Sequence, residues 1–243
     1  MDMPTDMQHQ AMGYDRTATM FSPDGHLLQV EYAEKTVRLG SASIGMVCAD
    51  GVFIISDKRV EDKLIIPKSA VKVHEVDSHI IATVAGIVSD ARVLIERAQV
   101  IAQQHRVTYD SPVEPEMVIK DIANIKQQFT QYGGARPFAV SMMLAGLNQN
   151  TNGGKPELFT SDITGNYFSY YANAIGENDE KMKEMLREKY KQDLDLKKGI
   201  KLALEIFEQV QGPKFKVSRF ELALIRTKTG KIERLEGSQI KDF

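Results

Sequence analysis

The sequence predicts an α+β protein in which two antiparallel sheets stack face to face with helices outside, a four-layer αββα sandwich. Strand-like and helix-like segments follow one another in blocks: strands, two helices, strands, two helices and final strands. Each helix pair carries one apolar stripe, which needs a sheet face to cover it. The chain has 243 residues, of which 42% are hydrophobic and 26% charged, a balance that suits one large globular domain.

The N-terminal region divides into an arm and a turn. Residues 1–13 are polar and lack an apolar run, so we expect a flexible arm ahead of a single domain over 14–243. Ser22-Pro23-Asp24-Gly25 has the residue order of a type I turn. We expect a helix over 24–38 that Gly40 ends, with apolar groups that one copy of the chain leaves uncovered.

The first strand block begins with a predicted hairpin. Residues 41–49 and 52–57 are strand-like and flank Asp50-Gly51, a strong two-residue turn signal. Two further strands are expected over 71–76 and 79–85.

Two helices are expected in the middle of the chain. One begins near Ser89 with apolar residues at helical spacing, and the second begins at Pro115, a residue that suits a first helical turn. Gly133-Gly134 is expected to end the second helix.

The second strand block is expected over 138–147, 157–162 and 166–174. Two more helices follow, for which Asn178 and Asp195 are the expected N-caps. The last strands are predicted over 219–227 and 231–235, joined near Thr229-Gly230.

Composition excludes several classes of function. The 31 basic and 33 acidic side chains give a net charge of −2, and the chain has no basic stripe of the kind that binds nucleic acid. The lone Cys48 and scattered histidines offer no metal-ligand spacing, so we expect no metal and no cofactor. No stretch is long and apolar enough to span a membrane, and we expect a cytoplasmic protein.

Several ordered motifs resemble those of α-type subunits of the proteasome core, most closely the archaeal ones. The resemblance covers residues 14 to about 235. It rests on these segments: Tyr14-Asp15-Arg16, Phe21-Ser22-Pro23-Asp24-Gly25, Gln29-Val30-Glu31-Tyr32-Ala33, Gly40-Ser41, Ser56-Asp57-Lys58, Asp90-Ala91-Arg92-Val93-Leu94, Gln131 to Pro137 and Ala174-Ile175-Gly176.

The resemblance implies the αββα fold and a place in a seven-membered ring of α subunits. Two such rings cap rings of catalytic β subunits in a particle that degrades unfolded proteins. The α ring controls substrate entry and binds the C-terminal tails of ATPase activators.

The resemblance also implies that this chain carries no catalytic residue. Catalytic β subunits use an N-terminal threonine whose free amine acts as the base. Here the first strand opens with Gly40-Ser41-Ala42-Ser43 instead. Asp57 and Lys72 stand where β subunits keep an acid and a lysine. The alternative is an active hydrolase in which cleavage releases Ser41 as the nucleophile.

Two sets of binding residues follow from the resemblance. Tyr14, Asp15, Pro23 and Tyr32 match the family's gate cluster, although a plain turn held by local packing is the simpler interpretation of the same residues.

Lys72 matches the lysine that receives an activator's terminal carboxylate, and Glu31 and Gly40 would line the same pocket. The simpler interpretation of Lys72 is a solvated lysine on a strand, like Lys58 or Lys63.

Overall fold

The computed structural model describes residues 12–60, 62, 64–66, 69–151, 153–241 and 243, and contains two five-stranded antiparallel sheets. The first sheet holds, in order, β10 (Ile232–Glu236), β9 (Phe220–Arg226), β2 (Gly51–Asp57), β1 (Ser43–Cys48) and β8 (Ala172–Ile175). The second holds β3 (Val73–Asp77), β4 (Ile80–Gly86), β5 (Val140–Asn148), β6 (Lys155–Ser161) and β7 (Tyr167–Ser169). The expectation of two stacked antiparallel sheets is confirmed.

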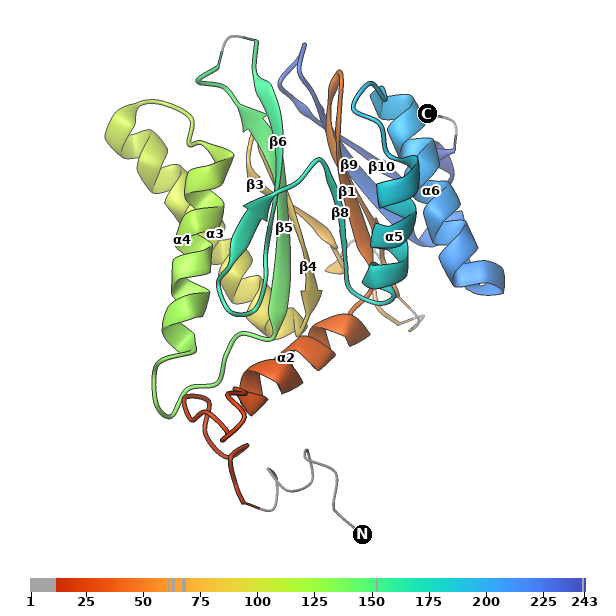
Figure 1. The fold of residues 1–243 in the computed structure, drawn as a ribbon. Helices are drawn as coiled ribbons and strands as arrows, with labels where there is room; N and C mark the ends of the chain where they lie inside the picture. Colours follow the sequence, from red (N-terminus) through yellow and green to blue (C-terminus); the bar gives the residue numbers. More distant parts are fainter. Residues whose placement is uncertain (1–11, 61, 63, 67–68, 152, 242) are drawn as a thin grey trace.

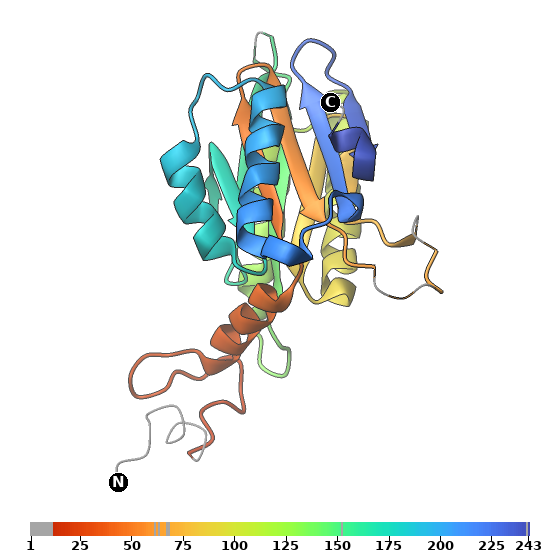
Figure 2. The ribbon, with the colours of Figure 1, turned by 90° about the vertical axis from the view of Figure 1, so that its right-hand side faces the viewer.

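Two helix pairs cover the outer faces of the sheets (Figures 1 and 2). On the second sheet lie α3 (Val88–Tyr109) and α4 (Pro115–Phe129), and on the first lie α5 (Asp179–Lys189) and α6 (Leu196–Gln211). The four layers are therefore helix, sheet, sheet and helix, as the block order predicts.

Of the two predicted N-caps, one forms and one does not. Asp195 caps α6, because its carboxylate accepts a hydrogen bond of 2.8 Å from the backbone N–H of Lys198. Asn178 stands at the N-cap position of α5 but adopts a left-handed conformation (φ 60°) with no side-chain cap, so the predicted capping role is wrong. α4 ends at Phe129, before Gly133-Gly134.

The hairpin between β1 and β2 forms at Ala49-Asp50, but Gly51 serves a different purpose from the predicted turn. It is the first residue of β2, and a Cβ there would lie 2.3 Å from the Ile225 carbonyl oxygen. The close approach of β9, not a left-handed turn, requires glycine at this position.

The segment predicted as one strand over 166–174 is two strands in different sheets. β7 pairs with β6, and β8 pairs with β1. Between them the Tyr170 N–H donates to Leu158 in one sheet, and the Tyr171 carbonyl accepts from Val47 in the other. The chain therefore crosses between the sheets here, a change that apolar alternation does not reveal.

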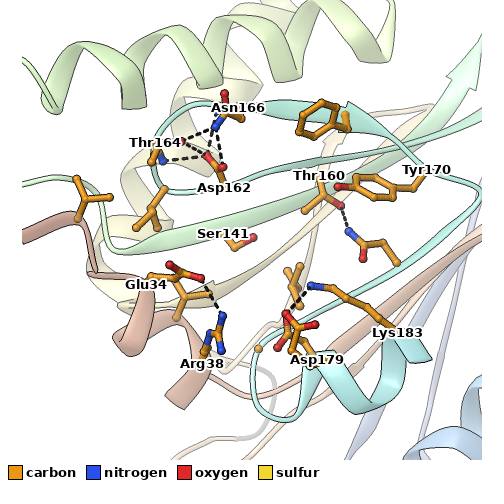
Figure 3. Close-up of a pocket in the computed structure, with 18 residues that line it drawn as sticks. Glu34, Arg38, Ser141, Thr160, Asp162, Thr164, Asn166, Tyr170, Asp179 and Lys183 are labelled. Carbon is orange, nitrogen blue, oxygen red and sulfur yellow. Dashed lines mark hydrogen bonds and ion pairs between the residues drawn. The ribbon is translucent and has the colours of Figure 1, made fainter. Parts of the chain in front are cut away.

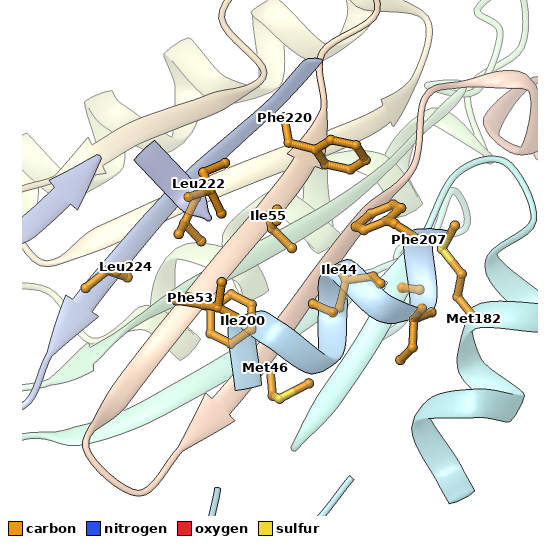
Figure 4. Close-up of a cluster of buried hydrophobic side chains, with 14 of the residues drawn as sticks. Ile44, Met46, Phe53, Ile55, Met182, Ile200, Phe207, Phe220, Leu222 and Leu224 are labelled. Atoms are coloured by element: carbon orange, nitrogen blue, oxygen red, sulfur yellow. The ribbon is translucent and has the colours of Figure 1, made fainter. Parts of the chain in front are cut away.

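Apolar side chains fill all three spaces between the four layers. The cluster between α5, α6 and the first sheet is shown in Figure 4 and includes Ile44, Phe53, Ile200, Phe207 and Leu222. Cys48 belongs to the same cluster, and burial raises the pKa of its thiol to about 12. Cys48 is therefore a small buried side chain and not a reactive thiol.

A bidentate ion pair joins the start of α3 to the segment before β5. The Arg136 guanidinium donates to both Asp90 oxygens at 2.6 Å, and the Ala139 N–H donates to Asp90 at 3.1 Å. The hydrogen bonds from Arg136 hold the Asp90 pKa below its ordinary value. Two of the segments that carry the resemblance thus contact each other directly.

Helix α2 (Leu28–Leu39) crosses one end of the sandwich (Figures 1 and 2). It begins at Leu28 because the Ser22–Gly25 turn precedes it, later than the predicted start at 24. Its apolar side is buried within the single chain through Leu28, Val30, Ala33 and Val37. The expectation that this helix leaves its apolar groups uncovered is therefore wrong for that face. No helix in the described part of the chain could span a membrane.

Candidate functional site

The N-terminal turn forms as the sequence predicts. The Gly25 N–H donates to the Ser22 carbonyl at 2.9 Å, and Gly25 has a φ of 83°, a conformation that favours glycine. The Ser22 hydroxyl accepts from the His26 N–H at 3.1 Å. Pro23 is exposed at the tip of this turn. Of the predicted arm over 1–13, residues 1–11 lie outside the described part of the chain.

The other predicted gate residues lie around the first half of α2. The carbonyl of Asp15 accepts from the Gln29 side-chain amide at 2.5 Å, which holds the incoming chain against the helix. Tyr14 and Tyr32 are half-buried, and the Lys35 ammonium lies 5.5 Å from the Tyr32 ring centroid. The turn and the segment before it are therefore both anchored to α2.

Gly40 and Lys72 come together at the end of β4, whereas Glu31 does not join them. A Cβ on Gly40 would lie 2.5 Å from the Gly86 backbone nitrogen, so only glycine allows α2 to approach β4 this closely. Glu31 lies nine residues earlier, about 13 Å along the helix axis. It pairs instead with His26, at 2.5 Å between Oε1 and Nδ1.

Lys72 immediately precedes β3, and its side chain is half-buried, not solvated as the simpler interpretation predicts. Its ammonium donates to the Val84 carbonyl at 2.5 Å. Burial lowers the Lys72 pKa to about 8, although the nearby Asp57 charge opposes that shift. Lys72 makes no ion pair with another described residue.

A cavity of about 670 Å³ opens beside Lys72, between β3 and α3. Its wall is apolar near Lys72, with Val71, Val84 and Val88, and polar farther along, with Glu75 and Arg234. Arg92 and Arg234 line the same cavity, but Lys72 is the cation beside the valines. An ammonium next to an apolar wall is suited to a carboxylate attached to an apolar segment.

Asp57 is the residue that the resemblance matches to the acid of catalytic subunits, and its carboxylate contacts three side chains. It is completely buried at the end of β2. Arg219 donates to both of its oxygens, Gln211 donates at 2.9 Å, and the Arg59 guanidinium lies 3.5 Å away. This carboxylate therefore acts as a structural anion.

Lys58 is also mostly buried, so the prediction that it is a solvated lysine is wrong. Its side chain is 11% exposed and its ammonium lies 3.8 Å from the Glu236 carboxylate. Lys63 lies outside the described residues.

Ser41 lies two residues before β1 and is half-buried. Gly176, at φ 94°, packs against this segment so closely that a Cβ would lie 2.7 Å from the Ser41 carbonyl oxygen. In the uncleaved chain the Ser41 nitrogen is bonded to Gly40, so a free amine at Ser41 would require cleavage of this bond.

A polar cavity of about 260 Å³, missed in the sequence, lies between α2, α5 and the turn after β6 (Figure 3). Its charged groups pair with one another: Arg38 with Glu34 at 2.9 Å and Lys183 with Asp179 at 2.7 Å. Asp162 accepts from the Thr164 and Asn166 backbones within its own turn. The Asp-Ile-Thr-Gly-Asn sequence is the local signal for that turn. Among the described residues, no three potential metal ligands cluster.

The fold and the position of the first strand define a sandwich of the N-terminal-nucleophile hydrolase type. The chain belongs to the proteasome subunit family, whose model matches residues 37–225. A separate model, for the N-terminal signature of A-type proteasome subunits, matches residues 14–35.

Archaeal relatives agree with this assignment. The chain is 40% identical over 231 residues to the proteasome alpha subunit of Pyrococcus horikoshii, covering 95% of this chain and 86% of the relative. It is 38% identical over 232 residues to that of Methanosarcina barkeri, covering 96% and 92%. The chain is thus an α-type, non-catalytic subunit of a threonine-type protease complex, not a hydrolase that uses Ser41.

Proposed function

We propose that this chain forms the seven-membered outer ring of a proteasome core in the cytoplasm, alone or with other α subunits. The ring stacks on catalytic β subunits, controls the entry of unfolded proteins and binds the C-terminal tails of ATPase activators. The observation that carries the docking role is Lys72, a half-buried cation that donates to a carbonyl and lines a cavity beside Val71, Val84 and Val88.

Exposed apolar side chains support association into a ring. Leu39 at the end of α2 is 80% exposed and Val88 at the start of α3 is 82% exposed. Leu64, in the segment between β2 and β3, is 91% exposed. Covering such side chains against a neighbouring subunit would bury apolar surface, which favours association.

Ring formation is tested by light scattering on the purified chain. We expect the mass of seven copies, or of stacked rings, at micromolar concentration. A monomer mass at that concentration would rule out self-assembly and leave only assembly with a different chain.

The gate is tested by deleting residues 2–13, which keeps Tyr14 and the Pro23 turn. The polar arm would crowd the pore, so we expect the particle assembled with β subunits to cleave peptides faster without an activator. The full-length particle is the control. Basal rates that the deletion leaves unchanged, for short and long substrates alike, would argue against a gating role for the arm.

A further inference from the structure

A second cavity, of about 600 Å³, lies where α6 ends, beside the end of β2 and the residues before α5. Four cationic side chains line it: Arg59, Lys214, Lys216 and Arg219. Among its described lining residues, Glu177 is the one carboxylate. Asp57 lies behind the two arginines, so four positive charges face two negative ones and the cavity is basic in a chain whose net charge is −2.

The two arginines have N–H groups that make no hydrogen bond to the described residues. A guanidinium has five N–H groups. Arg219 uses three, two on Asp57 and one on the Lys214 carbonyl, which leaves 5 − 3 = 2. Arg59 uses two, one on Glu177 and one toward Asp57, which leaves 5 − 2 = 3. Asp57 thus holds both guanidinium groups in place without exhausting them.

The two lysines add further positive charge. Lys214 and Lys216 are exposed, and neither forms an ion pair with another described residue. Glu177 and the side-chain oxygens of Asn178 and Gln211 are acceptors in the lining, but the cationic donors outnumber them, so the ligand that fits it carries several anionic oxygens.

The lining also indicates how compact the ligand is. No aromatic ring from the described residues lines the cavity, and its apolar contribution comes from Val210 and Pro213 alone. Little surface is available to stack a nucleobase or to bury a peptide chain. We propose that this cavity binds a short polyphosphate anion through Arg59, Arg219, Lys214 and Lys216.

Calorimetric titration of the full-length chain with sodium triphosphate at low ionic strength tests this proposal. We expect the variant with both Lys214→Ala and Lys216→Ala to bind at least about tenfold more weakly, since each lysine supplies a charge-assisted contact. The matched control carries Lys197→Ala and Lys201→Ala, two exposed lysines at the other end of α6, and should bind like the unmodified chain. Thermal unfolding of each variant checks that the fold is intact.

Three results would overturn the proposal. Equal affinity in the unmodified chain and the Lys214/Lys216 variant, or no binding in either, would show that these lysines only complement the carbonyl end of α6. Tighter binding of a tetraglutamate peptide than of triphosphate would show that the cavity takes an acidic protein segment instead.

Discussion

The resemblance matches Asp57 and Lys72 to the acid and the lysine of catalytic proteasome subunits, but the surroundings of these two residues differ. Asp57 is completely buried and contacts Arg219, Gln211 and Arg59. The Lys72 ammonium donates to one carbonyl, that of Val84, and Lys72 lines a cavity of about 670 Å³. In this chain, which lacks the nucleophile, the Asp57 carboxylate therefore stabilises the fold, whereas the Lys72 ammonium lies where a ligand could reach it.

The largest expected effect is on the stability of the Asp57 cluster. Asp57→Ala removes the completely buried anion that the partly exposed Arg219 and Arg59 guanidinium groups share. We expect the free energy of unfolding to fall by about 3–5 kcal/mol, the usual cost of removing one partner from a buried ion pair. Chemical denaturation measures this at fixed protein concentration.

Asp121→Ala, at an exposed position on α4, is the control for the Asp57 variant. A loss below about 1 kcal/mol for Asp57→Ala would mean that the cluster is incidental to the fold, as exposed ion pairs commonly are. The contrast with Lys72 would then have no energetic basis.

Lys126 extends the comparison to a buried lysine that lines none of the three cavities described above. Its ammonium is fully buried and contacts the Ser161 carbonyl and hydroxyl at 3.3 Å and the Asp162 carbonyl at 3.2 Å. Burial lowers the Lys126 pKa from 10.5 to about 7, with the Asp162 charge opposing the shift. Unlike Asp57, this group has no opposite charge within hydrogen-bonding distance in the described structure.

This shift predicts a rise in stability with pH. Below pH 7 both states are protonated and folding bears the full cost of burying the charge. Between 7 and 10.5 the unfolded chain binds the extra proton, so the free energy of unfolding rises by about 1.4 kcal/mol per pH unit. We expect Lys126→Met to flatten this rise over pH 7–9.

The control for the pH experiment is Lys120→Met, an exposed lysine on the same helix, which should follow the unmodified chain. Lys72 and other groups contribute equally to all three proteins, so the difference between variants isolates Lys126. Parallel pH profiles for Lys126→Met and Lys120→Met would show that Lys126 is not the source of the pH dependence.

Local signals in the sequence predicted local structure well, but they did not predict contacts between residues far apart in the chain. Asp195 caps α6 through a residue only three positions away. Asp57, in contrast, is held by Arg219 and Gln211, more than 150 residues along the chain. The crossing at Tyr170 and Tyr171 was missed because alternation looks the same in either sheet.

The same limit applies to the predicted site, in which some residues lie together and others do not. Gly40 and Lys72 meet because the chain reversals between β2 and β4 bring them to one strand end, which the resemblance implied and spacing alone did not. Glu31 was grouped with them by the resemblance, but in this chain it pairs with His26. Lys58 was misjudged because its partner, Glu236, lies near the C-terminus.

The most direct test of the Lys72 assignment is a binding measurement on the assembled ring. Two peptides with the last ten residues of an ATPase activator are compared, one with a free C-terminal carboxylate and one amidated. We expect Lys72→Ala to weaken binding of the free-acid peptide about tenfold to a hundredfold, the equivalent of ~1.5–3 kcal/mol. Lys72→Ala should no longer distinguish the two peptides, whereas the unmodified ring and a Lys120→Ala control should. If Lys72→Ala still prefers the free acid by the same factor, the carboxylate binds elsewhere and Lys72 is not the docking residue.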